Sequence, residues 1–310
     1  MASVARMRDD QTVTFYLHSK LRKQAEAGNH NFISKISDVV HNADLHIAFD
    51  DDDTAARLRA MARPGYGLFL MQEPVNDRCL TFRKTYIYPF WRIEKQGKRW
   101  EWPVAKATFD PTEQNLRKSA NFQRFWRNRL FRGPVNTHEG GFIHVPLQGR
   151  LLTHRSFQIC SPIKMIETVL RCDPTRRVIA TLHPSETYSA TEQQALQDLL
   201  DQHPRLRLES SGSEYLLAHC DYIVTQNSSV GFMGFFLDKP LILFGKTDFH
   251  HIALSVETVG AQRAFDMIAD HQPDYAAYLF WFLQMQAINA GRPEATDRIA
   301  TTLRSHGWPI

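Results

Sequence analysis

The sequence predicts an α/β protein built from two domains, and three observations support this. The chain has 310 residues, about twice the roughly 150 residues of a typical domain. In the second half, apolar strand-like runs alternate with helical patterns, which predicts βαβ units and a parallel sheet with helices on both faces. The first half carries a similar but less regular pattern. We therefore place the domain boundary just before Phe142, which gives domains of 1–141 and 142–310.

The second half contains five predicted strands separated by helices. The strands are Phe142–Leu147, Arg177–Leu182, Arg205–Glu209, Tyr222–Gln226 and Leu241–Gly245, and the helices are Ile163–Arg171, Thr191–Gln202, Glu214–Ala218 and Val230–Leu237. A parallel sheet of this kind binds its ligands beyond the carboxyl ends of the strands.

The first half is predicted to hold a second α/β domain. Its strands are Thr12–Leu17, Leu45–Phe49 and Gly67–Met71, and its helices are Phe32–His41 and Thr54–Met61. In the aromatic-rich segment that follows, Tyr86, Tyr88 and Phe90 alternate as in a strand. Residues Phe265–Ala290 predict helices, and we expect C-terminal helices to pack back on the first domain.

The composition is that of a soluble globular protein with a mildly basic charge. A net charge of +4 and a pI near 8.9 favour anionic substrates or surfaces without requiring nucleic acid, which we do not expect as a partner. The four cysteines form no C-x-x-C motif, which favours a reduced compartment and disfavours a thiolate metal site. The N-terminal residues lack the apolar region of a secretory signal, and no apolar run approaches the roughly 20 residues of a membrane span. These features predict a cytoplasmic protein.

Three predicted strands are followed by loops with polar residues. Gln148 follows the first strand of the second half, His183-Pro184-Ser185-Glu186 follows the next, and Asn227-Ser228-Ser229-Val230-Gly231 follows Tyr222–Gln226. If the strands are parallel, the three loops open at one edge of the sheet. Their convergence is more informative than any one of them.

The serine loop has two interpretations. Its hydroxyls can cap the helix that follows, which would make it an ordinary turn. Alternatively, Gly231 and Gly234 allow close backbone approach, so that the first N–H groups of the helix face a phosphate. The segment matches neither a P-loop, nor a G-x-G-x-x-G fingerprint, nor a G-x-S-x-G nucleophile turn.

His183 and Glu186 also have two interpretations each. A histidine at a strand end can donate to a phosphate or act as an acid near neutral pH, but it can equally be a surface residue before the turn proline Pro184. Glu186 is either a base or ribose contact, or the first turn of a helix.

The run Asp50–Asp53 suggests a metal site at first sight. Four consecutive residues rarely supply converging ligands, and Asp53 directly precedes the helix predicted from Thr54. We therefore interpret Asp53 as a helix cap and expect no metal site.

Residues Asn115–Pro134 contain six Lys or Arg residues and no acid. Phe122, Phe125, Trp126 and Leu130 are predicted to share one helical face. Such a helix suits an anionic membrane surface, which raises peripheral attachment at the inner membrane as an alternative. A core-packing helix with a solvated basic face is at least as plausible.

Several short motifs resemble those of the bacterial capsular polysaccharide biosynthesis family, which includes the β-Kdo transferases of capsule assembly. They are Val145-Pro-Leu-Gln148, Leu182-His-Pro184, Val224-Thr-Gln-Asn-Ser-Ser-Val-Gly231 and Lys239-Pro-Leu-Ile-Leu-Phe-Gly245. The resemblance covers roughly 142–255.

The resemblance implies a GT-B architecture, in which two Rossmann-like domains with parallel sheets face a cleft. It implies that His183 binds a CMP phosphate or ribose, and that Ser228 and Ser229 hold the phosphate with the helix N-terminus. Pro184, Asn227 and Gly231 would also belong to the donor-binding site. Gln148 would line the cleft near the sugar. The donor nucleotide-sugar would be a substrate, with no cofactor and no bound metal.

The chain also departs from the family pattern. Leu151, Leu152 and Thr153 stand where relatives commonly have an acid, and Met233 stands where they tend to have Glu. Replacement catalytic carboxylates could come from Glu139, Glu186 or Asp248, and the sequence does not choose among these three.

Two functions therefore stay open. The first is a glycosyltransferase of capsule or surface polysaccharide biosynthesis, which moves a Kdo-like sugar from a CMP-linked donor to a glycan or glycolipid acceptor. The second is a catalytically degenerate GT-B protein that acts as a nucleotide- or glycan-binding assembly factor. An epimerase or hydrolase on the same fold is a third, weaker alternative. The retained Gln148, His183 and serine pair favour transfer, whereas the missing acids favour the assembly factor.

Overall fold

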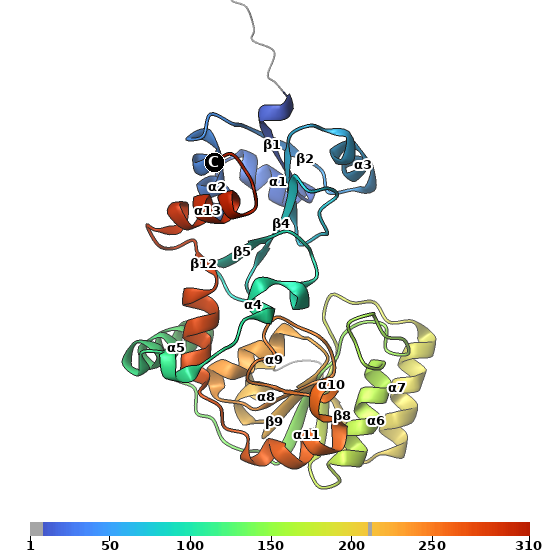
Figure 1. Ribbon diagram of the computed structural model, residues 1–310. Coiled ribbons are helices and arrows are strands. Elements are labelled where there is room, and N and C mark those ends of the chain that lie inside the picture. Colours follow the sequence, from blue (N-terminus) through green and yellow to red (C-terminus); the bar gives the residue numbers. More distant parts are fainter. Residues whose placement is uncertain (1–8, 210–212) are drawn as a thin grey trace, which may run out of the picture. The chain divides into compact units, whose positions relative to one another are not determined.

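The computed structural model describes residues 9–209 and 213–310 (Figure 1). The chain divides into two compact α/β units, Met1–Trp102 with Leu283–Ile310, and Pro103–Phe282. The boundary expected just before Phe142 differs from this division. Residues 103–141 belong to the second unit because helix α5 (Leu116–Leu130) packs on α12 (Tyr275–Leu279). The end of the chain belongs to the first unit, where α13 (Ala295–Ser305) packs against α2 (Asn31–His41).

The first unit contains a six-stranded sheet in the order β12-β5-β4-β3-β1-β2. Strands β2, β1, β3 and β4 are parallel, whereas β5 and β12 are antiparallel to their neighbours. The strands are β1 (Thr12–Tyr16), β2 (His46–Asp50), β3 (Tyr66–Leu70), β4 (Cys79–Lys84), β5 (Phe90–Glu94) and β12 (Ile288–Asn289). The helices are η1 (Asp9–Gln11), α1 (Ser19–Glu26), α2, α3 (Thr54–Ala62), η2 (Arg99–Glu101) and α13. The core is aromatic: the rings of Phe32 and Trp91 stack at 4.8 Å.

Asp53 caps α3 by accepting a 2.7 Å hydrogen bond from the Ala56 N–H, as predicted. The strand expected across Tyr86–Phe90 is wrong, because Tyr86 has a positive φ of 61° and lies in the turn between β4 and β5. Aromatic alternation alone did not reveal this turn.

The second unit contains a fully parallel sheet in the order β11-β10-β9-β6-β7-β8. Its strands are β6 (Phe142–Pro146), β7 (Arg177–Thr181), β8 (Leu206–Glu209), β9 (Tyr222–Thr225), β10 (Leu241–Leu243) and β11 (Leu254–Ser255). The helices before and between them are α4 (Pro103–Lys106), η3 (Pro111–Glu113), α5, α6 (Pro162–Cys172), α7 (Ala190–Gln202), α8 (Ser213–His219), α9 (Ser229–Gly234) and η4 (Phe235–Leu237). After β11 come α10 (Val256–Val259), α11 (Ala261–Met267), η5 (Ile268–Asp270), α12 and the π-helical turn η6 (Phe280–Met285).

The core of this unit forms because strand side chains alternate between the two faces. Val224 belongs to a buried cluster with residues of α6, α7 and α11. Its neighbour Ile223 points to the other face, where it meets α9 at Gly234. A Cβ added at Gly234 would lie 2.2 Å from Ile223 Cδ1, so a larger residue here would force the Ile223 side chain to move within a packed core.

Candidate functional site

The strand order of the second unit predicts where a ligand binds. The chain starts the sheet at the central strand β6, moves outward through β7 and β8, and then returns to β9 on the other side of β6. This is the doubly wound order, with its switch point between β6 and β9. Ligands of such sheets bind beyond the carboxyl ends of the strands at the switch point.

The three polar loops lie at this edge. Gln148 follows β6, His183 follows β7, and Asn227 follows β9, and these strands are neighbours in the parallel order β9-β6-β7. The Thr225 hydroxyl donates a 3.0 Å hydrogen bond to the Pro146 carbonyl, which joins the ends of β9 and β6. The parallel order expected from the sequence is therefore present, and it brings the three loops to one edge.

The loops after β6 and β7 are connected through Arg155. Its guanidinium donates a 3.2 Å hydrogen bond to the Gly149 carbonyl and lies 3.8 Å from a carboxylate oxygen of Glu186. The Glu186 carboxylate covers Gly149 so closely that an added Cβ would lie 2.1 Å from its Oε2. Glu186 is thus held at the carboxyl edge, with its carboxylate partly exposed.

The conformation of His183 leaves one ring nitrogen free to donate. Its Nδ1 accepts a 3.2 Å hydrogen bond from the Ser185 N–H, so the neutral ring carries its proton on Nε2. The backbone N–H of His183 donates to the Tyr188 hydroxyl at 2.9 Å. His183 and Pro184 are exposed, which leaves this Nε2–H available to an acceptor oxygen.

The serine loop combines a cap with buried polar groups. Ser228 is the N-cap of α9, and its hydroxyl accepts a 3.2 Å hydrogen bond from the Val230 N–H. Ser229 is exposed. Asn227 is 4% exposed, and its Oδ1 has no hydrogen-bond partner among the described residues. The loop therefore caps α9 and also carries a buried acceptor, Asn227 Oδ1, that has no hydrogen-bond partner among the described residues.

Gly231 has a packing role in this loop. An added Cβ would lie 3.1 Å from Leu241 Cδ1 and 3.2 Å from Thr225 Cγ2, on the side of α9 that faces the sheet. Its N–H donates to the Ser228 carbonyl at 3.0 Å. The glycine is thus explained by the contact of α9 with β9 and β10 rather than by close approach of a ligand.

The other two candidate carboxylates lie elsewhere. Asp248 follows β10 but is completely buried, and the Thr247 hydroxyl donates to it at 3.3 Å. Glu139 precedes β6, so it lies at the amino edge of the sheet, opposite the three loops. There it lines a cavity of about 470 Å³ with Asp221 and Lys239. The structure does not bring Glu139 together with the other candidates.

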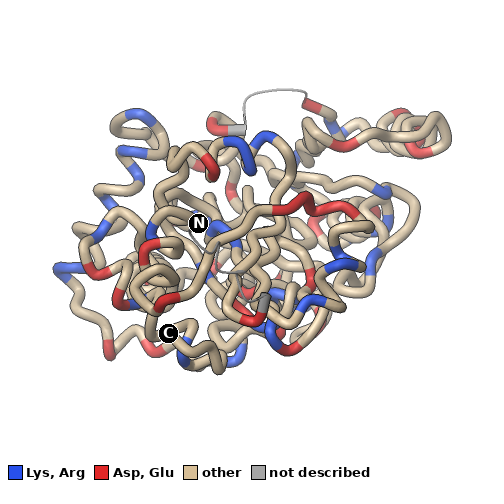
Figure 2. Tube along the Cα trace, turned by 90° about the horizontal axis from the view of Figure 1, so that it is seen from above, with Lys and Arg blue, Asp and Glu red and all other residues tan. Residues whose placement is uncertain are grey.

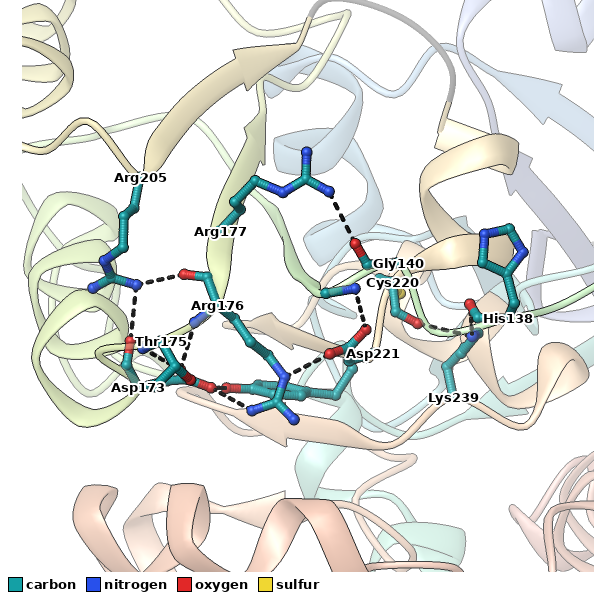
Figure 3. Close-up of polar contacts among 12 residues, drawn as sticks. His138, Gly140, Asp173, Thr175, Arg176, Arg177, Arg205, Cys220, Asp221 and Lys239 are labelled. Carbon is teal, nitrogen blue, oxygen red and sulfur yellow. Dashed lines mark hydrogen bonds and ion pairs between the residues drawn. The ribbon is translucent and has the colours of Figure 1, made fainter.

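The amino edge of the sheet is held by a polar network (Figure 3). The Asp173 carboxylate accepts hydrogen bonds from the Tyr222 hydroxyl at 2.8 Å and from the Arg176 guanidinium at 2.9 Å. Asp221 accepts from Arg176 at 2.6 Å and from the Gly141 N–H at 2.9 Å. Because these contacts join the starts of β6, β7 and β9 and satisfy one another, we interpret the network as part of the scaffold.

Ionisation in this network follows from its contacts. Burial opposes ionisation of Asp173, but hydrogen bonds from the Arg176 backbone, the Tyr222 hydroxyl and the Arg176 guanidinium hold its pKa below the usual range. Burial, together with the neighbouring carboxylate, raises the pKa of Tyr222. Burial also lowers the pKa of Lys239, whose Nζ donates to the Cys220 carbonyl at 2.8 Å.

The basic helix α5 packs differently from the expectation that four apolar residues share one face. Trp126 is buried and Phe122 is half-buried against Phe280, with ring centroids 5.6 Å apart, whereas Phe125 is 57% exposed. The exposed surface of α5 therefore carries Phe125 among basic residues, and Trp126 alone of the four apolar residues is buried. Basic and acidic residues both occur along the whole trace (Figure 2).

Sequence reasoning missed Gln158, which hydrogen-bonds to Gln148 of the loop after β6 and to Gln226 at the end of β9. It lies in the irregular segment between β6 and α6, where neither periodicity nor spacing gives a signal. Only its three-dimensional contacts identify it.

Residues 153–291 match the model of a family described as capsule polysaccharide biosynthesis protein. The predicted family resemblance is confirmed. Among curated proteins, no sequence is significantly similar to this chain.

Three solved structures superpose on most of this chain. The β-Kdo 2,7-transferase KpsC of Thermosulfurimonas dismutans superposes with a TM-score of 0.55 at 11% identity, covering 96% of this chain and 99% of that one. The β-Kdo 2,4-transferase of the same organism gives 0.47 at 11% identity over 86% and 89% of the two chains. The UDP-GlcNAc 2-epimerase of Methanocaldococcus jannaschii gives 0.41 at 10% identity over 95% and 99%. The superposition on the 2,7-transferase shows that the chain has a GT-B fold.

Within residues 9–209 and 213–310, none of the helices combines the length and apolar character needed to cross a bilayer.

Proposed function

We propose that this protein is a glycosyltransferase of capsule or surface polysaccharide biosynthesis. It transfers a Kdo-like sugar from a CMP-linked donor to a glycan or glycolipid acceptor. The observation that carries the proposal is the convergence of Gln148, His183 and the loop Asn227–Ser229 at the ends of neighbouring parallel strands. The family match and the transferase-like fold support the choice of reaction.

The free donor groups at this edge suit a phosphate. In the neutral ring, His183 Nε2–H is available to a phosphate oxygen, and Ser229 is exposed one residue beyond the cap. Hydrogen bonds to a leaving phosphate stabilise its developing charge and favour cleavage of the bond to the sugar.

We also expect transfer to need no bound metal, so that excess EDTA leaves the rate unchanged.

Glu186 is the carboxylate that best fits a role as general base. It is the only one of the three candidates that combines partial exposure with a position at the carboxyl edge of the sheet, because Asp248 is buried and Glu139 lies at the amino edge. In this role it would accept the proton of the acceptor hydroxyl during transfer. The Arg155 guanidinium lies 3.8 Å from its carboxylate.

The first test is calorimetric titration with CMP, UDP and GDP, followed by transfer assays with CMP-Kdo and a lipid-linked glycan. We expect CMP to bind most tightly, and sugar transfer that Glu186→Gln reduces at least about a hundredfold with little change in CMP affinity. Asp248→Asn and Glu139→Gln serve as comparison variants. A protein that binds none of the three nucleotides would contradict the proposal.

A second function is favoured by one specific observation. Leu151, at a position where relatives commonly carry an acid, is 1% exposed and belongs to the hydrophobic core. A protein that has lost this carboxylate can retain the nucleotide site and act as an assembly factor that binds nucleotide or glycan. CMP binding without transfer to any tested acceptor would favour this function over the first.

We further propose that α5 contacts an anionic membrane surface. Arg117 and Arg124 are exposed on the helix, together with the largely exposed ring of Phe125. Basic side chains around an apolar residue suit the headgroup region of anionic lipid. The test is flotation with vesicles of phosphatidylglycerol and phosphatidylcholine. Arg117→Glu/Arg124→Glu should abolish flotation, whereas the charge-matched control Lys20→Glu/Lys23→Glu on α1 should not. Equal loss in both variants would contradict a specific role of α5.

A further inference from the structure

The segment Arg155–Cys160 is fixed across the carboxyl edge of the second unit. Its backbone pairs with the chain that follows β10: the Ile159 N–H donates to the Phe244 carbonyl at 2.9 Å, and the Lys246 N–H donates to the Phe157 carbonyl at 2.8 Å. Between these two bonds, Gln158 forms an antiparallel bridge with Gly245. Gln158 is therefore held at a fixed position, and it is only 5% exposed.

The side chain of Gln158 lies between two other glutamines. Its Nε2 donates to Gln226 Oε1 and, at 3.3 Å, to Gln148 Oε1. Gln226 is the last residue before the serine loop, and Gln148 follows β6. One amide group thus bridges the two loops that flank the switch point.

Backbone groups fix the orientation of two of the three amides, Gln226 and Gln158, and the third follows from them. Gln226 Nε2 donates to the Cys160 carbonyl at 2.7 Å, and a carbonyl can only accept, so Gln226 must turn its oxygen toward Gln158. Gln158 Oε1 accepts from the Arg155 N–H at 2.7 Å, and an N–H can only donate. Both anchors require the NH₂ of Gln158 to face the other two glutamines. Gln148 can then meet it only with its oxygen.

The amide of Gln148 is left with its NH₂ group unused. Among the described residues, no protein group accepts a hydrogen bond from Gln148 Nε2, and the side chain is half-exposed. A planar amide whose oxygen is occupied presents two N–H donors on its other branch.

We propose that Gln158 is a positioning residue, which holds Gln148 so that its NH₂ group faces the bound ligand. Gln148 is then a hydrogen-bond donor, and the ligand group that it recognises is a phosphate oxygen of the bound nucleotide. This inference rests on the proposed function only for the identity of the ligand.

The substitution Gln158→Glu tests the proposal because it keeps the size of the side chain and removes its donors. A carboxylate at this position accepts from Gln148, so Gln148 turns its NH₂ inward and presents its oxygen to the ligand. We expect CMP affinity to fall about tenfold to a hundredfold, as in Gln148→Ala. The double variant Gln158→Glu/Gln148→Ala should be no weaker than Gln148→Ala alone, because both changes remove the same donor.

A second measurement needs no ligand. In protein labelled with ¹⁵N-glutamine, the NH₂ signal of Gln148 is identified by its loss in Gln148→Ala. Its hydrogens should exchange rapidly with water in the wild type and at least about tenfold more slowly in Gln158→Glu, where they donate to the new carboxylate. If Gln158→Glu does not fold, Gln158→Met replaces it, and CMP affinity should then fall by less than in Gln148→Ala.

These measurements separate the two proposals. If the wild type binds no nucleotide, the proposed function fails, and the exchange rates still decide the role of Gln158. Protection of the Gln148 NH₂ in the wild type, unchanged CMP affinity in Gln158→Glu, or fully additive losses in the double variant would each overturn the positioning role.

Discussion

The Tyr222 hydroxyl donates a 2.8 Å hydrogen bond to the Asp173 carboxylate and so connects the start of β9 to the turn before β7. Both side chains are nearly inaccessible to solvent. A carboxylate in this position stabilises the fold only while it is both ionised and hydrogen-bonded. Protonation removes its charge-assisted hydrogen bonds, and loss of its partners leaves a buried charge without compensation. The amino edge of the sheet is therefore predicted to be sensitive to acid.

Asp173→Asn should lower the free energy of unfolding by about 3 kcal/mol at pH 7. Since the pKa of Asp173 is lower in the folded than in the unfolded protein, its contribution is complete above the unfolded value of about 4 and is lost as the pH falls through the folded value. Urea unfolding at pH 7, 5, 4 and 3 measures this. The difference between wild type and variant should shrink below pH 4, whereas the exposed control Asp198→Asn should differ little at any pH. A constant difference would contradict the assignment.

His183→Ala should weaken CMP binding about tenfold or more and leave the melting temperature nearly unchanged. The side chain is exposed and offers its Nε2–H to the ligand, whereas its loss removes no core contact. Calorimetry and thermal unfolding measure the two effects. His46→Ala, an exposed histidine in the first unit, is the matched control and should leave CMP affinity unchanged. Unaltered binding in His183→Ala would show that the phosphate lies elsewhere.

Substitution of the two serines after β9 should distinguish the contribution of helix capping from that of ligand binding. Ser228→Ala removes the N-cap of α9 and should cost about 1 kcal/mol of stability, while Ser229→Ala should cost little because its side chain is exposed. Both variants should lower CMP affinity if the loop holds the phosphate. Chemical denaturation and calorimetry on the same samples provide the comparison. Wild-type CMP affinity in Ser228→Ala/Ser229→Ala would remove the serines from the site.

The contact between Gly234 and Ile223 predicts that Ile223→Val restores part of the stability lost in Gly234→Ala. Gly234→Ala places a methyl group against Ile223 Cδ1 and should lower stability by about 1–3 kcal/mol. Ile223→Val removes that carbon atom and alone should cost about 1 kcal/mol. The double variant Gly234→Ala/Ile223→Val should then be more stable than the sum of the single effects predicts, as measured by denaturant unfolding. Strict additivity would mean that the two groups are not in contact.

The local chemistry of this protein is determined by its sequence. Alternating strand and helix patterns in the second half indicate a parallel sheet, and the order of Gln148, His183 and Asn227–Gly231 along the chain indicates a site at its carboxyl edge. Asp53 is recognisable as a cap because capping depends on neighbouring residues. Each of these features rests on interactions within a few residues or on the period of one element.

Tertiary structure decided what depends on contacts between distant residues. The division at 102 and 282 follows from the packing of α5 and α13, and the turn at Tyr86 from the pairing of β4 with β5. The placement of Glu139 at the amino edge and of Glu186 at the carboxyl edge follows from the direction of the strands. Gln158 lies ten residues from Gln148 and sixty-eight from Gln226, and only folding brings the three amides into one hydrogen-bonded chain. Such a contact leaves no local sequence pattern, because the groups that form it are distant in sequence and become neighbours only when the chain folds.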